Sequence, residues 1–158
     1  MLCLNRKQVS TRDLFPVLTE VIEQGYRAKF IISGNSMRPW LVDNRDQVLI
    51  SSIRGRKLKK GDIILYRNQQ DNYILHRIHR VEERGYRTMG DACTHEDDML
   101  VRYHDILGVV EEIDRKGKTL KCSSILSRMQ FAVWGMMLPL REEILWFYYF
   151  LLRIKSKL

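Results

Sequence analysis

The sequence is short of cysteine: Cys3, Cys93 and Cys122 are the three in 158 residues, and no two have CxxC spacing. An odd, widely spaced set argues against a disulfide framework and favours a reducing compartment. The chain also lacks an uninterrupted apolar run of the roughly 20 residues that a helix needs to cross a bilayer. These absences predict a cytoplasmic protein, and they leave peripheral attachment to the inner face of a membrane open.

Acidic residues are outnumbered. The chain has 27 Lys and Arg against 19 Asp and Glu, which gives a formal net charge of +8 and favours acidic partners such as nucleic acid, anionic headgroups or acidic polypeptide. Five positive charges lie within residues 54–60 (RGRKLKK), which indicates either a solvated loop or a contact for phosphate. No aromatic residue is interleaved there to stack on bases, which counts against single-stranded nucleic acid. We expect no specific nucleic-acid partner.

The pattern of apolar residues predicts one small, mainly β domain. Apolar residues at three- and four-residue spacing predict a helix over residues 10–25. Short β-type runs separated by Gly, Asn and Asp then favour a compact, coiled antiparallel β domain, with no helix between its strands. The expected strands cover residues 29–33, 47–53, 62–67, 73–82, 86–89, 106–113 and 119–122.

This pattern divides the chain into an N-terminal helix packed on the core (1–26), a β domain (27–124) and an apolar, basic-flanked helical segment (125–158). In the last segment, residues 129–140 carry no charge and residues 144–152 are all apolar or aromatic. Three interpretations stay open for it: peripheral membrane contact through 129–158, a cover for the β core, or a dimer contact.

Ser36 is the first candidate for chemistry. It lies in the segment GNSMRP at 34–39, directly after an expected strand, where a neighbouring glycine and proline can hold its hydroxyl rigidly. A serine beside a glycine is more often a plain turn residue. A hydroxyl is a poor nucleophile at neutral pH, so a base must lie within hydrogen-bond reach.

His76 is the candidate base. On a strand, alternate residues share a face, so His76 lies with the apolar Ile74 and Ile78 while His79 points to the other side. The two histidines therefore do not form a chelating pair, and we expect neither a metal nor another cofactor. A satisfied core histidine is the alternative interpretation.

A third candidate group lies in the acidic stretch at residues 89–98. A carboxylate there can accept a hydrogen bond from an imidazole, fix its tautomer and stabilise the imidazolium. The alternatives are an ordinary polar loop or a cation site, although the spacing matches no EF-hand loop. The carboxylates in question are Asp91, Glu96, Asp97 and Asp98.

Taken in order, five segments resemble the signal peptidase I and LexA-like serine peptidases, and most closely the Ser-His signal peptidases of the ER and archaeal type. They agree in order and approximate spacing over residues 28–110. The segments are SMRP at 36–39, KGDIILY at 60–66, LHRI at 75–78, GD at 90–91 followed by Asp97, and ILGVV at 106–110.

The resemblance implies a coiled, mostly β catalytic fold and a serine endopeptidase that cleaves a protein or peptide precursor. It implies Ser36 as nucleophile, His76 as general base and Asp97 as the carboxylate that orients the base. Asp91 is implied as a supporting group. The backbone N–H of Ser36 is the expected first donor to the oxyanion.

The sequence departs from this family in two ways. Gly34 stands where many members have a serine that assists the oxyanion, so the second donor is open between Ser33 and Asn35. The usual N-terminal membrane anchor is missing, which favours a cytoplasmic or specialised precursor as substrate.

Two alternative functions remain. A LexA-like self-cleaving regulator would use lysine as its base and carry a DNA-binding domain, for which the one helix before the β region is too little. The other is a catalytically silent module that binds a membrane surface or nucleic acid, an interpretation favoured by the positive charge and the aromatic C-terminal segment.

Overall fold

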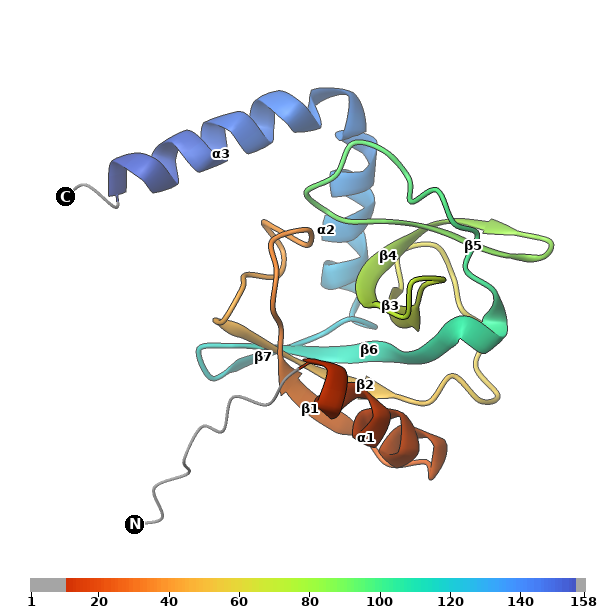
Figure 1. Cartoon of the computed structure of the whole chain (residues 1–158). Coiled ribbons are helices and arrows are strands. Elements are labelled where there is room, and N and C mark those ends of the chain that lie inside the picture. Colours follow the sequence, from red (N-terminus) through yellow and green to blue (C-terminus); the bar gives the residue numbers. More distant parts are fainter. Residues whose placement is uncertain (1–10, 156–158) are drawn as a thin grey trace, which may run out of the picture.

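A computed structural model describes residues 11–155, and the side chains of 15–154 (Figure 1). Within these residues, seven antiparallel strands form one open sheet, accompanied by three α-helices. The predicted mainly β fold, with a helix before the sheet and helices after it, is therefore confirmed. Cys3 and the expected helix start at Ser10 lie outside the described residues.

Every expected strand is present, with ends that lie within two residues of the prediction and agree at both ends for residues 73–82. The only addition between strands in the described part is a short 3-10 turn, η1 (Tyr103–Asp105). The strands are β1 (Ala28–Ile31), β2 (Asp46–Ser51), β3 (Ile63–Arg67), β4 (Tyr73–Glu82), β5 (Gly85–Met89), β6 (Ile106–Arg115) and β7 (Lys118–Lys121). The helices are α1 (Thr11–Glu23), α2 (Ile125–Met136) and α3 (Arg141–Lys155), with a 3-10 turn η2 (Leu138–Leu140) between the last two.

The sheet runs in the order β1-β2-β6-β3-β4-β5, and β7 pairs with β6. Its buried side chains form two apolar clusters. The first joins α1, through Phe15, Leu18 and Ile22, to the sheet. The second lies around Ile64 and Ile78, on β3 and β4. Sequence-distant segments are thereby brought together, since β2 pairs with β6 and β3 lies between β6 and β4.

Asp46 closes the loop that carries Ser36. Its backbone carbonyl accepts a hydrogen bond from Ile32 N, and its fully buried carboxylate accepts bonds from Arg45 Nε (2.7 Å), Val42 N (3.0 Å) and Arg115 Nη2 (3.2 Å). Burial raises the pKa of this carboxyl, but the hydrogen bonds and positive charges outweigh burial and hold the pKa below its ordinary value. The loop between β1 and β2 is therefore tied at its base by a charged group.

We expect Asp46→Asn to lower the free energy of unfolding by about 1–3 kcal/mol at pH 7, because an amide cannot accept all these bonds. The folded-state pKa of Asp46 is depressed, so its contribution is present above the unfolded-state pKa, near 4, and is lost as the pH falls through the folded-state value. Urea unfolding should therefore show a smaller difference between the two proteins at pH 3 than at pH 7. Asp71→Asn, at an exposed position, is the control, and an equal loss there would contradict the prediction.

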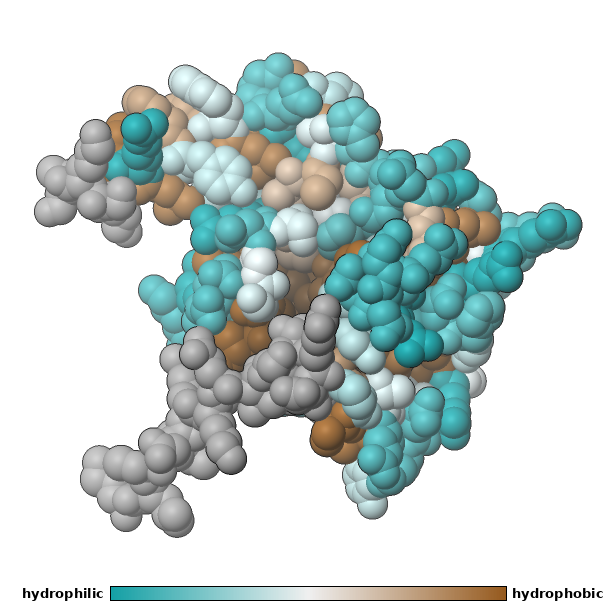
Figure 2. Space-filling model, viewed as in Figure 1, coloured by the Kyte–Doolittle hydropathy of each residue, from teal (hydrophilic) through white to brown (hydrophobic). Residues whose placement is uncertain are grey.

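The C-terminal helices differ in how they contact the body. Ser124 caps α2 by accepting a hydrogen bond from Ser127 N, and the inner face of α2 buries Phe131 and Trp134. Helix α3 then extends away from the body as an arm, with apolar side chains along its surface (Figures 1 and 2). The sequence left three interpretations open for this segment: membrane contact, a cover for the β core, or a dimer contact. The inner face of α2 covers the core, as the second of these states. No helix within residues 11–155 combines the length and apolar character required to cross a membrane.

Candidate active site

His76 lies on β4 with its ring almost fully buried, and it is bound to a carboxylate. Its Nδ1 lies 2.8 Å from Asp97 Oδ2. Asp97 follows β5 and is fixed by its own backbone, since its N–H donates to the carbonyl of Thr88 at 2.8 Å. Because the ionised carboxylate can only accept, we assign the imidazole proton to Nδ1. This tautomer leaves Nε2 free to accept a proton.

Two further side chains hold Asp97 in its ionised form. The hydroxyls of Thr88 and Tyr66 donate to the same oxygen, Oδ2, at 2.6 and 3.0 Å. Burial raises the pKa of Asp97, but the bonds from His76, Thr88 and Tyr66 outweigh burial and lower it. Burial also raises the pKa of Tyr66, so its phenol stays protonated as a donor. Sequence reasoning did not identify Tyr66 or Thr88 as site residues, although Tyr66 ends one of the quoted segments.

Ser36 lies exposed on the loop between β1 and β2, next to the buried Met37. Its carbonyl accepts a hydrogen bond from Ala92 N at 2.8 Å, which ties this loop to the segment after β5. Gly34 has φ of +103°, a backbone conformation that a serine would adopt only with strain, so glycine here serves the turn. Gly34 N donates to Asp43 Oδ1 at 2.9 Å, which fixes the same turn.

Gly90 is the point at which the serine loop and the histidine meet. A Cβ atom placed on Gly90 would lie 2.6 Å from the Ser36 carbonyl oxygen and 3.1 Å from His76 Nε2. It would also lie 2.9 Å from the Sγ atom of Cys93. The backbone of Ser36 and the proton-accepting nitrogen of His76 therefore pack against the same glycine, and no side chain fits between them.

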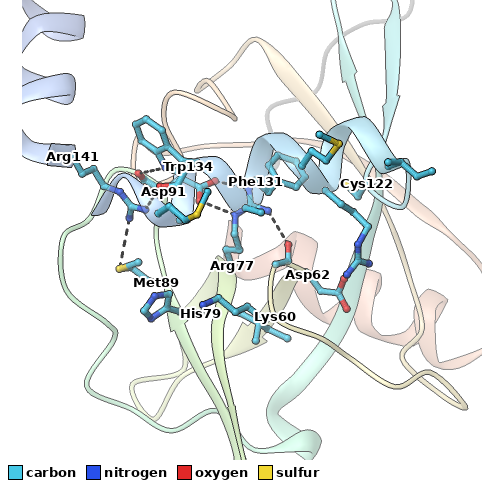
Figure 3. Close-up of a pocket in the computed structure, with 18 residues that line it drawn as sticks. Lys60, Asp62, Arg77, His79, Met89, Asp91, Cys122, Phe131, Trp134 and Arg141 are labelled. Atoms are coloured by element: carbon cyan, nitrogen blue, oxygen red, sulfur yellow. Dashed lines mark hydrogen bonds and ion pairs between the residues drawn. The ribbon is translucent and has the colours of Figure 1, made fainter. Parts of the chain in front are cut away.

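Asp91 forms a buried ion pair with Arg77. The two oxygens of Asp91 accept from Arg77 Nε at 2.8 Å and Nη2 at 2.6 Å, and Arg77 Nη1 donates to the Gly61 carbonyl at 2.8 Å. Arg77 neighbours His76 on β4 and points to the other face of the sheet, where it lines a cavity (Figure 3). Asp91 thus holds the segment after β5 in place from the side of β4 opposite the imidazole.

Helix α2 and Arg141, the first residue of α3, contact the loop that carries Ser36 and the segment after β5, a role that the sequence did not predict. Trp134 Nε1 donates to the Asp91 carbonyl at 3.1 Å, and Arg141 Nη1 donates to the Cys93 carbonyl at 2.8 Å. On the serine loop, the ring of Trp40 packs edge-on against Phe131, with ring centroids 5.4 Å apart. Phe131 and Trp134 come from a stretch whose only sequence signal was its aromatic, uncharged composition, and Arg141 comes from the charged residues that follow it.

Glu96, another acidic residue of this loop, contacts a different pair of basic side chains, His79 and Arg80. Glu96 accepts bonds from His79 Nδ1 and from Arg80 Nη2, both at 2.6 Å. Burial raises the pKa of Glu96, but these two bonds outweigh burial and lower it. The two histidines of β4 therefore contact different carboxylates. Across the described part of the chain, no three His, Cys, Asp or Glu side chains converge as a metal site would require.

The two described cysteines, Cys93 and Cys122, are free thiols. Burial raises the pKa of Cys93 and raises that of Cys122 to about 11, so both stay protonated at neutral pH. A thiol in that form is a weak nucleophile. Cys93 adjoins the site at Gly90 as a protonated thiol.

These parts have the roles that acyl transfer requires: an exposed hydroxyl, a buried imidazole with a free nitrogen, and an ionised carboxylate that orients the imidazole. No protein-family model matches the chain, and no curated protein matches it significantly. The site is therefore interpreted from its own contacts.

Proposed function

We propose that this protein is a serine endopeptidase that cleaves a protein or peptide precursor. The observation that carries the proposal is the orientation of His76, whose Nδ1 is bound to Asp97 at 2.8 Å while Nε2 lies beside Gly90. His76, Tyr66 and Thr88 all contact the same oxygen of Asp97. The two hydroxyls thereby fix the carboxylate in the position from which it orients the imidazole. A histidine that only filled the core would not require an oriented free nitrogen next to an exposed serine loop.

In the proposed reaction, His76 Nε2 takes the proton of Ser36 Oγ as the oxygen attacks the scissile carbonyl. The imidazolium that forms is stabilised by Asp97 and then gives its proton to the leaving amine. Water hydrolyses the acyl-enzyme by the same proton transfers. The Ser36 N–H donates to the oxyanion, and a donor in this position lowers the barrier by about 3–4 kcal/mol. Ser33 and Asn35, both exposed on this loop, stay candidates for the second donor.

The test is cleavage of a proteome-derived peptide pool, with new termini identified by mass spectrometry. We expect new termini with the wild-type protein and none with Ser36→Ala or His76→Ala. Ser123→Ala is the matched control for the nucleophile and His95→Ala for the base, since both positions are exposed and neither is a candidate for the site. A fluorophosphonate probe adds a readout that needs no substrate: it should label Ser36 in the wild type and not in His76→Ala. Identical peptide patterns and no labelling would refute the proposal.

Gly90→Ala is expected to lower the cleavage rate by about 100-fold, because a shift of the order of 1 Å in a catalytic group has effects of this size. The new methyl group would meet the Ser36 carbonyl oxygen at 2.6 Å, and this backbone atom cannot rotate away. Gly135→Ala is the matched control, since its Cβ meets nothing within 4 Å. Initial rates on one cleaved peptide, with thermal unfolding for both variants, provide the comparison. A Gly90→Ala protein as active as Gly135→Ala would contradict the packing described here.

A further inference from the structure

The outer face of α2 is apolar and uncovered, although its inner face is packed against the body. At 100° per residue, its exposed apolar side chains fall within one arc of about 100°, opposite the buried Phe131 and Trp134. We call this set the outer stripe: Ile125, Leu126, Met129, Val133 and Met136. A continuous apolar strip of this kind on a helix marks a contact surface.

The stripe is bordered by positive charge. A cavity of about 690 Å³ lies beside α2, with Lys60 at its edge (Figure 3). Ile125, Met129 and Met136 of the stripe contribute to its lining, and the cations there outnumber the carboxylates: Lys60, Arg77, Arg128 and Arg141 against Asp62 and Asp91. Lys60 ends the basic loop at residues 54–60, whose lysines at 57, 59 and 60 are exposed. The sequence of α2 contains no acidic residue.

We propose that the outer stripe of α2, with Lys60 and Arg128 beside it, docks this protein on an anionic lipid bilayer surface. Apolar side chains would enter the boundary between headgroups and acyl chains, and the neighbouring cations would pair with the headgroup phosphates. Helix α3 adds exposed aromatic side chains, among them the stacked Trp146 and Phe150, of the type enriched at membrane interfaces. This proposal is independent of the peptidase reaction.

The positive charge beside the stripe favours an anionic bilayer over a second copy of the chain as the partner of this surface. Two copies meeting through this face would each bring Lys60, Arg128 and a formal charge of +8, and these repel. An anionic surface meets the same charges with attraction. Helix α2 also contains no acidic side chain that could pair with the cations of a second copy and reduce this repulsion.

Vesicle binding of the full chain tests this. The vesicles are phosphatidylcholine alone, or phosphatidylcholine with about a third phosphatidylglycerol. We expect at least about tenfold tighter binding to the anionic vesicles, weakening as salt is raised. Met129→Asp/Val133→Asp should weaken that binding by about tenfold or more. The matched control is Val17→Asp/Val81→Asp, because all four positions are about half exposed or more (61, 48, 57 and 51%) and the control pair lies outside α2.

A second variant, Lys60→Glu/Arg128→Glu, keeps the apolar stripe and reverses the charges beside it, so it tests the surface even where the aspartate variant unfolds. It should also lose about tenfold on anionic vesicles. Thermal unfolding shows which variants are folded. The proposal is overturned if the wild-type protein binds anionic vesicles no more tightly than neutral ones. It is also overturned if the α2 variants and the control variant bind anionic vesicles with equal affinity. It is equally overturned if sedimentation equilibrium shows a dimer that Met129→Asp/Val133→Asp dissociates, since the stripe would then be covered.

Discussion

Asp97→Asn should lower the cleavage rate by about 10⁴-fold while leaving the protein folded. The amide keeps the shape of the carboxylate. With its NH₂ group in the place of Oδ2, it donates to His76 Nδ1, the hydroxyls of Thr88 and Tyr66 turn to accept, and the ring proton moves to Nε2. In that tautomer Nε2 cannot accept the Ser36 proton. A factor of 10⁴ corresponds to about 5.4 kcal/mol of barrier, which makes this the largest effect on activity that we predict for an isosteric change.

Asp98→Asn is the matched control, since it makes the same change one residue further on, at an exposed position. Initial rates on a cleaved peptide give the effect on activity. Nitrogen-15 NMR of the His76 ring gives the tautomer and requires no substrate. A proton that stays on Nδ1 in Asp97→Asn, or a rate within tenfold of Asp98→Asn, would show that Asp97 does not orient the base.

Arg77→Met should lower the free energy of unfolding by about 3–5 kcal/mol, because it leaves the Asp91 carboxylate buried without its cation. The change also removes the donor to the Gly61 carbonyl and the guanidinium that lies 3.9 Å from the ring centre of Phe131. The free energy of unfolding of a typical domain is only about 5–15 kcal/mol, so this loss would be a large part of the total. Urea unfolding monitored by circular dichroism measures it.

Arg80→Met is the control on the same strand, where the arginine is exposed and pairs with Glu96 at the surface. An exposed pair contributes about 0–1 kcal/mol, so little loss is expected. The double variant Arg77→Met/Asp91→Leu should recover much of the stability lost in Arg77→Met, because neither member of this ion pair is left buried without the other. A double variant as unstable as the single one would mean that the loss comes from packing and not from the uncompensated carboxylate.

The strands were predictable because each is a local pattern: short apolar runs punctuated by Gly, Asn and Asp mark both ends. The opposite orientations expected for His76 and His79 follow from the same alternation, and their different carboxylate partners agree with it. The acidic stretch at residues 89–98 was also identifiable as part of the candidate site. The side chain of Asp97, which the family resemblance assigned to the imidazole, is the one in contact with it.

What sequence reasoning missed depends on which strands lie side by side. Tyr66 and Thr88 reach Asp97 only because β3 and β5 both flank β4, and that neighbour order is a long-range property. The role of α2 was hidden for another reason. Its residues are apolar on both faces, so periodicity cannot indicate that Trp134 is buried and Met136 exposed.

The order of the strands also has a consequence for how the chain acquires its site during synthesis. Ser36 is made early, but the segment that its carbonyl contacts ends near Cys93, and that segment is bound in turn by Trp134 and Arg141. The pairing of β2 with β6 likewise joins Asp46 to Arg115, which is 69 residues further along the chain. Such non-local contacts form late in folding. A ribosome-bound chain that has not yet reached α2 would thus carry the serine and the histidine without the contacts that hold their loops together. If the proposed reaction is correct, the newly made protein would not cleave until α2 and the start of α3 had docked.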